Sequence, residues 1–228
     1  MTSPAFARIA PFAAWIACIA LESLLAQAGA VGWTALADAA ASGWAYAVRT
    51  VVVAGVLAVF WRGYAELRPG TALRAGTLAE ALAAGVLVFG LWITVGPLLR
   101  LGEANVPAIP VGTGGAPDLL WLALRLAGTV LVVPVIEELF WRSYVMRRID
   151  MHDFMTLAPA RVSGIAVLMS SVVFAAGHRE VAAGVLAGLV LAWLYRRHGD
   201  LRLAILAHAV TNVLLGAYVL ATGHYEFW

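Results

Sequence analysis

Two adjacent carboxylates, Glu137 and Glu138, stand in an apolar part of the sequence just before Arg142. Glu138 and Arg142 are four positions apart, so on a helix they share one face and can form an ion pair. Glu137 is rotated from Glu138 by about 100° on a helix, which leaves it without such a partner. Pro134 predicts a bend and a freed backbone carbonyl one turn earlier. We therefore expect a structural pair, Glu138 with Arg142, and a cavity-facing Glu137 that can act as a general base.

Two further polar pairs follow at the same spacing. Phe174 precedes His178 by four residues, so that the ring can wall a pocket into which the imidazole points. His208 and Asn212 repeat this spacing inside another apolar stretch, and together they can bind a water, a carbonyl oxygen or a metal.

Each motif also has an ordinary structural interpretation. The Glu138–Arg142 pair is typical of a helix end at the lipid headgroups, a lone histidine is commonly a packed residue, and His208 with Asn212 can be an interhelical clamp. Glu22, in the first apolar stretch, has no obvious partner and is assigned no role. Their order, on separate apolar segments, favours one shared site for the three motifs.

The composition predicts that these segments lie in a lipid bilayer. Of the 228 residues 63% are hydrophobic and 12% are charged, with a mean hydropathy of +0.89. A soluble domain carries about 25% charged residues. The net charge of +2 and the absence of a dense basic cluster indicate no nucleic-acid partner. The single cysteine, Cys18, excludes an intramolecular disulfide.

The predicted fold class is all-α, a polytopic transmembrane bundle of about seven or eight helices. A span needs about 20 mostly apolar residues. We expect one membrane domain, 1–228, with a catalytic core at 119–222, an irregular loop near 99–118 and an interfacial stretch at 149–161. Ala26-Gln27-Ala28 imitates a signal cleavage site, but the preceding apolar run is long, so a retained helix is favoured. The candidate spans are 9–29, 44–61, 76–98, 119–148, 162–178, 181–197 and 202–221.

The arginines orient this bundle. All 15 basic residues are arginine, and with the N-terminus inside, 11 lie at cytoplasmic ends, three lie at the other side and Arg125 lies within the fourth span. We expect an integral membrane protein with a cytoplasmic N-terminus. Its composition favours the bacterial inner membrane. The cytoplasmic set is Arg8, Arg62, Arg68, Arg74, Arg142, Arg147, Arg148, Arg161, Arg196, Arg197 and Arg202.

At the three motifs the sequence resembles the CAAX protease and bacteriocin-processing family, also called Abi, which includes the type II CAAX prenyl endopeptidases. The family pattern is EExxxR, FxxxH and HxxxN or HxxxD on separate membrane helices, and no position departs from it. The resemblance implies an intramembrane glutamic endopeptidase. In it Glu137 and His178 activate water, and His208 and Asn212 stabilise the oxyanion or hold the water.

The motifs leave open whether a metal ion takes part in the reaction. Glu137, His178 and His208 are of the types that ligate catalytic zinc, yet HExxH is absent and the family is also described as metal-independent. We favour no cofactor, with zinc as the alternative.

Two stretches are similar to one bacterial branch of the family, the CAAX-protease-related proteins of exosortase and PEP-CTERM systems. They are Phe140-Trp141-Arg142-Ser143 and the segment that ends in Phe227-Trp228. An exosortase-system partner is the corresponding expectation, beside membrane lipid and a peptide or membrane-protein substrate. The alternatives are a non-catalytic scaffold or immunity-type protein of the same fold, and a small transporter.

Overall fold

The computed structural model describes residues 3–68, 72–102, 106, 108–112, 114–115 and 117–227, except for the side chain of residue 31. Among these residues the only strand-like pairings are two isolated bridges, Arg100 with Glu180 and Val111 with Pro117. The helices are α1 (Pro4–Gln27), α2 (Thr34–Ala41), α3 (Trp44–Phe60), α4 (Ala75–Thr94), α5 (Leu119–Ala127), α6 (Val133–Glu137), α7 (Met146–Asp150), α8 (Gly164–Ala175), α9 (Val181–His198) and α10 (Leu201–Thr222).

The segments α5, α6 and α7 form one long helix, because π-helical turns at Gly128–Val132 and Glu138–Val145 join them. With these three taken as one, the described residues contain eight helices. The predicted all-α bundle of about seven or eight helices is therefore confirmed.

Five helical segments are long and apolar enough to cross a membrane, and they confirm an integral membrane protein. They are Pro4–Ala30, Trp44–Gly63, Ala75–Leu98, Leu119–Asp150 and Leu201–Thr222. The predicted span 162–178 is wrong in length, since α8 has only 12 residues and ends at Ala175. The predicted span at 181–197 forms α9 (18 residues) but is not among these five. Its last turn carries Arg196, Arg197 and His198, which lower its apolar character.

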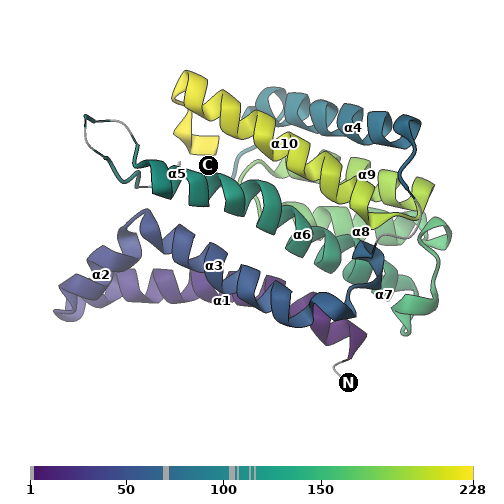
Figure 1. Cartoon of the computed structure of the whole chain (residues 1–228), viewed down its shortest axis with the longest axis horizontal. Helices are drawn as coiled ribbons and strands as arrows, with labels where there is room; N and C mark the ends of the chain where they lie inside the picture. The colour runs from purple at the N-terminus through teal and green to yellow at the C-terminus, as the bar shows by residue number, and fades with distance from the viewer. Residues whose placement is uncertain are drawn as a thin grey trace.

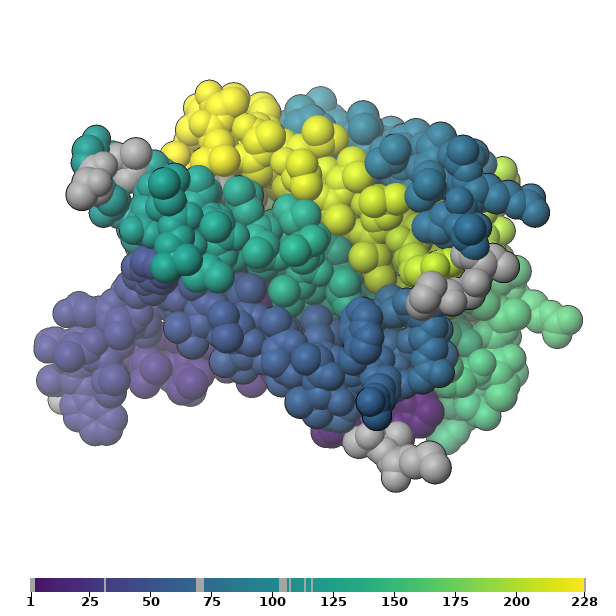
Figure 2. All heavy atoms as spheres, viewed as in Figure 1, coloured from purple at the N-terminus to yellow at the C-terminus, as the bar shows by residue number. Residues whose placement is uncertain are grey.

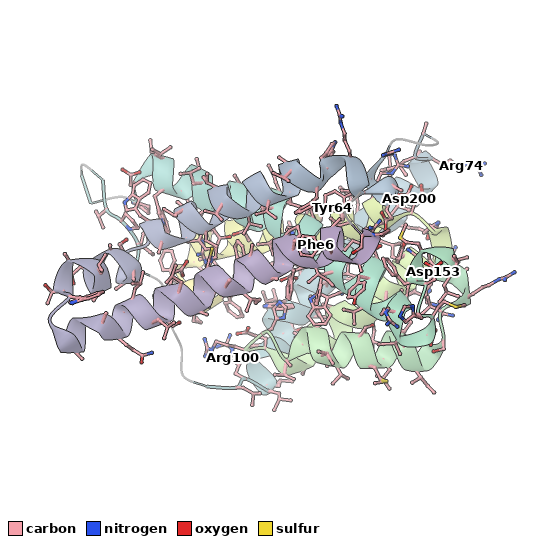
Figure 3. The ribbon with its side chains drawn as sticks, turned by 90° about the horizontal axis from the view of Figure 1, so that it is seen from below. Phe6, Tyr64, Arg74, Arg100, Asp153 and Asp200 are labelled. Carbon is pink, nitrogen blue, oxygen red and sulfur yellow. The ribbon has the colours of Figure 1, made fainter. Side chains whose placement is uncertain are left out.

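The chain runs back and forth between two ends of the molecule (Figure 1). The N-terminus, the α3–α4 connection, α7 and the α9–α10 turn lie at one end, while α2 and the segment before α5 lie at the other. Figure 3 likewise places Arg74, Asp153 and Asp200 together at one end and Arg100 away from them. On the face seen in Figure 2, the surface of α3 (blue) meets that of the teal segment containing α5 along a seam.

Capping residues set several of these boundaries. Asp118 begins α5 by accepting a hydrogen bond from the amide of Trp121, and Ser163 begins α8 in the same way. Gly199 adopts the left-handed conformation (φ 69°) that ends α9, and Asp200 then caps α10, so two antiparallel helices are joined by a two-residue turn.

Small residues bring the helices close together. A Cβ atom on Gly85 of α4 would lie 2.5 Å from the carbonyl oxygen of Ala207 in α10, and one on Gly188 would lie 2.7 Å from the Cβ atom of Ser171 in α8. Thr211 adds a hydrogen bond of 2.9 Å from α10 to the Gly85 carbonyl. Such contacts are typical of membrane helix packing, and here they hold α10 between α4 and the long α5–α7 helix.

The predicted loops contain short helical turns. The stretch 149–161 holds 3₁₀ turns at Phe154–Thr156 and Pro159–Arg161. The break between the predicted spans 9–29 and 44–61 contains the end of a 3₁₀ turn (Ala28–Val31) and all of α2. The described part of 99–118 is irregular apart from its three bridge residues, Arg100, Val111 and Pro117, as expected from its prolines and glycines.

Arg147, one of the arginines assigned to the cytoplasmic side, is buried, and its guanidinium donates to the carbonyls of Leu157 and Met155 and so fixes this connection.

Candidate active site

The paired carboxylates lie where the long helix changes register. Glu138 and Arg142 are both buried, and Arg142 Nη1 donates to Glu138 Oε1 at 3.1 Å. The guanidinium of Arg142 also lies 4.3 Å from the centre of the Phe174 ring. Glu138 and Arg142 are therefore a buried ion pair packed against the aromatic ring of the second motif.

His208 is attached to the same carboxylate, a contact that the spacing of the motifs did not predict. Its Nδ1 lies 2.9 Å from Glu138 Oε1, and its Nε2 lies 3.9 Å from Glu137 Oε2. Because an ionised carboxylate only accepts, Nδ1 carries the proton in this hydrogen bond, and Nε2 is the ring atom left for chemistry. Glu138 thus orients His208 as well as neutralising Arg142.

Glu137 is held differently from its neighbour. Its Oε2 is buried and makes no hydrogen bond to another described residue, whereas Glu138 binds both Arg142 and His208. Glu138 is thus paired and Glu137 Oε2 is not, while the chemical roles expected for the two carboxylates stay a prediction.

His178 lies outside α8, in the turn that follows it, and not on a helix as the spacing suggested. Its Nδ1 is 3.0 Å from the carbonyl oxygen of Phe174, and its ring is 4.6 Å from the Phe174 ring and 5.4 Å from that of Trp92. A carbonyl only accepts hydrogen bonds, so Nδ1–H donates and Nε2 keeps its lone pair.

The α8–α9 turn comes earlier in the chain than the predicted span 162–178 required, because α8 ends at Ala175. At the end of this turn Glu180 is only 6% exposed. Glu180 forms a bridge and an ion pair (3.2 Å) with Arg100, and Gly96 passes close to its side chain. These contacts attach the turn that contains His178 to the segment that follows α4.

Asn212 binds a backbone carbonyl that Pro134 leaves without a helical donor. In the π-helical turn the amide of Val133 donates to the carbonyl of Gly128, five residues back. The next donor in that register would be Pro134, which has no N–H. The carbonyl of Thr129 instead accepts from Asn212 Nδ2 at 2.7 Å.

Thr129 is a site residue that the sequence reasoning missed, although Pro134 signalled a freed carbonyl nearby. Its hydroxyl donates to the carbonyl of Arg125, and it therefore accepts from the Tyr46 hydroxyl at 2.9 Å. Tyr46 of α3 thus supports the same segment from the N-terminal half of the chain.

One cavity of about 640 Å³ collects these groups. Its lining includes Glu137, His178, His208 and Asn212, together with Phe174 and Thr129. Glu138 and Arg142 are not on its surface and lie behind it. Three sequence-distant segments therefore present a carboxylate, two imidazoles and an amide to one space that is otherwise mainly apolar.

The C-terminal segment borders the same cavity. Glu226 and Phe227 line it, and the Phe227 ring lies 4.6 Å from the guanidinium of Arg100. A backbone hydrogen bond holds the pKa of Glu226 below its ordinary value; burial opposes it with a smaller effect, and the hydrogen bond and charge of His224 add to the lowering. The neighbouring Trp228 lies outside the described residues.

No group of three or more His, Cys, Asp or Glu side chains in the described part of the chain is arranged to hold a metal ion. His208 comes within 3.9 Å of Glu137, while the Nδ1 atoms of both histidines are used by protein acceptors.

The fold and this cavity define a class, that of helical membrane proteins with a buried Glu/His site. Within it, residues 119–214 match the family model described as type II CAAX prenyl endopeptidase Rce1-like. No curated protein and no solved structure matches the chain. All three motifs lie inside the matched segment, and the family is one of proteases.

Proposed function

We propose that the protein is an intramembrane endopeptidase that hydrolyses a peptide bond with a water activated by Glu137. The observation that carries this is the shared cavity of about 640 Å³, in which Glu137, His178, His208 and Asn212 meet. Hydrolysis within lipid requires such a space, which admits water and a peptide while excluding acyl chains.

The geometry suggests a role for each group. Glu137 takes a proton from water as the oxygen attacks the carbonyl carbon, and the same proton passes to the amide nitrogen as the C–N bond breaks. His178 accepts a hydrogen bond from that water through Nε2, because its Nδ1–H is held by Phe174. The products are a carboxylic acid and an amine.

In this proposal His208 and Asn212 stabilise the oxyanion. His208, when protonated, donates through Nε2, since its Nδ1 is held by Glu138. Asn212 has one N–H on the Thr129 carbonyl and a second for the developing charge. Glu138, Arg142 and Thr129 are positioning residues in this proposal.

The test is cleavage by the purified protein in proteoliposomes, with a pool of membrane peptides analysed by mass spectrometry. Glu137→Ala or His208→Ala should lower cleavage by about 100-fold or more. Glu80→Gln, which changes a carboxylate on α4 bonded to Arg197, is the matched control and should retain activity. Full activity in the Glu137 variant would remove the proposed base.

A chelator in the same assay addresses zinc. We propose a metal-free reaction, so cleavage should persist after chelation, with metal analysis showing that no zinc remains. Loss of cleavage that added zinc restores would favour the metal mechanism instead.

A non-catalytic scaffold or immunity-type protein of this fold is the second candidate. It predicts no peptide product and tolerance of Glu137→Gln, because shape and hydrogen bonding persist.

The proposal also includes the orientation of the protein in the membrane. We place the N-terminus in the cytoplasm of a bacterial cell, because the ends that carry most arginines lie together in Figure 1. An exosortase-system partner remains a weaker part of the same proposal.

A further inference from the structure

The segment that follows α10 forms part of the wall of the candidate active site. At the end of α10, Gly223 adopts the left-handed conformation (φ 75°), and the chain then turns back (Figure 1). Within the short turn Tyr225–Phe227, Glu226 and Phe227 line the cavity of about 640 Å³ that also contains His178. The proposed reaction gives this segment no role.

Aromatic rings attach the segment to α10. The ring of His224 stacks on that of Tyr218, with 5.9 Å between their centres, and the ring of Phe227 meets Tyr218 edge-on at 6.0 Å. His224 Nδ1 lies 2.9 Å from Glu226 Oε1. Residues 221–224 are exposed, so these contacts are local, and a segment held in this way can open while α10 stays folded.

Arg100, in the segment after α4, contacts both this segment and the turn that contains His178. Its guanidinium lies 4.6 Å from the centre of the Phe227 ring, and its Nε lies 3.2 Å from Glu180 Oε1. The backbones of Arg100 and Glu180 also form an isolated bridge. One cation therefore connects Phe227 with the turn between α8 and α9.

The two contacts of Arg100 differ in strength. Glu180 is buried, and both the charge of Arg100 and the backbone bridge hold it, although neither Arg100 Nε nor Glu180 Oε1 has a hydrogen-bond partner in the described structure. The contact with Phe227 is a single cation–π interaction between partly exposed groups, which is the weaker kind. We therefore expect the ring contact to open first, while Arg100 stays with Glu180.

We propose that residues 223–227 are a lid of the cavity, held closed by the contact of Phe227 with Arg100. The lid opens about Gly223 to admit a substrate, and the same arginine is a positioning residue for the turn that contains His178. Hinges of this kind are a few residues at the end of an element that absorb the change in backbone angles. The word substrate rests on the proposed proteolysis, but the opening of the lid can be measured without turnover.

The experiment measures how fast a charged methanethiosulfonate modifies a cysteine in the cavity of the full-length protein in detergent, followed by mass spectrometry. The background variant is Cys18→Ala, and the reporter is Ala187→Cys, at a buried position of the cavity lining. Phe227→Ala and Arg100→Gln should each raise the rate by about fivefold, the factor expected for one cation–π contact between partly exposed groups.

The double variant Arg100→Gln with Phe227→Ala tests whether the two residues act through one contact. Its rate should equal that of either single variant, because the second change has no contact left to remove. Phe227→Trp keeps a ring, and the best one for a cation, so it should not raise the rate. Multiplication of the two single effects, or an unchanged rate in Phe227→Ala, would overturn the lid.

Two controls separate lid opening from loss of structure. Trp193→Ala removes a cation–π contact of similar kind with Arg197 on α9, and it should leave the reporter at the wild-type rate. A second reporter, Ala84→Cys, is buried and outside the described lining of the cavity, and Phe227→Ala should not change its rate. An equal rise at both reporters would show general loosening and overturn the lid, whereas a protein without protease activity would still give the expected rates.

Discussion

Glu137 and Glu138 are neighbours in sequence yet have different surroundings. Glu138 is fully buried and binds Arg142 and His208, whereas Glu137 reaches the cavity and has a buried oxygen without a hydrogen bond. The two positions differ by about 100° around the helix, which is enough to direct one side chain into the protein and the other into the cavity.

Exchanging each carboxylate for an amide should separate these environments. Glu138→Gln leaves the Arg142 charge buried without a partner, so we expect a loss of about 3–5 kcal/mol of unfolding free energy. Glu137→Gln should unfold close to the wild-type temperature while cleavage is lost. Thermal unfolding in detergent measures both, and equal destabilisation of the two variants would show Glu137 to be structural.

The irregular turns of the α5–α7 helix free a backbone carbonyl at the cavity. An ordinary α-helix over 119–150 would use the Thr129 carbonyl internally, but the π-helical turn and Pro134 leave it for Asn212 of α10. Because Pro134 has no N–H, the Thr129 carbonyl accepts from Asn212, and this hydrogen bond joins the two helices at the cavity wall. Pro134 could be noted from the sequence, but its acceptor and donor could not, because the π-helical register depends on the packing of neighbouring helices.

Pro134→Ala tests this connection. The new N–H can compete for the Thr129 carbonyl, so Asn212 should lose its fixed position, and cleavage should fall by about 10-fold to 100-fold. Stability should hold or rise, because proline in a helix interior costs about 3 kcal/mol. Pro159→Ala, in the turn before α8, is the control for activity and unfolding, and an active Pro134→Ala enzyme would contradict the role given to this carbonyl.

At the scale of the molecule, a buried ionic network joins the N-terminal helices to the catalytic segment. Arg8 of α1 bonds Glu66 through Nη2 (2.5 Å) and Nε (2.9 Å), and Ser143, one residue after Arg142, donates its hydroxyl to Glu66. Burial alone would raise the pKa of Glu66, but the hydrogen bonds and charge of Arg8 outweigh it and hold that pKa below the ordinary value of 4.5.

This lowered pKa predicts acid sensitivity. The ionised Glu66 contributes its full stability above about pH 4.5, the ordinary pKa, and the contribution is lost as pH falls through the lower folded-state pKa. Glu66→Gln should therefore be less stable than wild type at pH 7, by about 3 kcal/mol. The difference should narrow below pH 4.5 in unfolding measured across pH. A constant difference between the two proteins at every pH would argue against the ion pair.

The sequence by itself determined the lipid-embedded helical fold and indicated candidate residues for a site. Apolar runs of span length can be satisfied only by helices in a bilayer, and a carboxylate or imidazole in such a run is costly enough to mark a function. The three motifs could therefore be found, and Glu137 distinguished from Glu138, without coordinates.

Only the tertiary structure decided how these residues meet. In the folded protein α8 is short, so that His178 lies in the turn after it, His208 bonds to Glu138, and Asn212 bonds to Thr129. Arg100 and Phe227, far apart in sequence, also come into contact there. Periodicity reports which face of a helix a residue occupies, whereas depth and partner depend on contacts between segments that are distant along the chain.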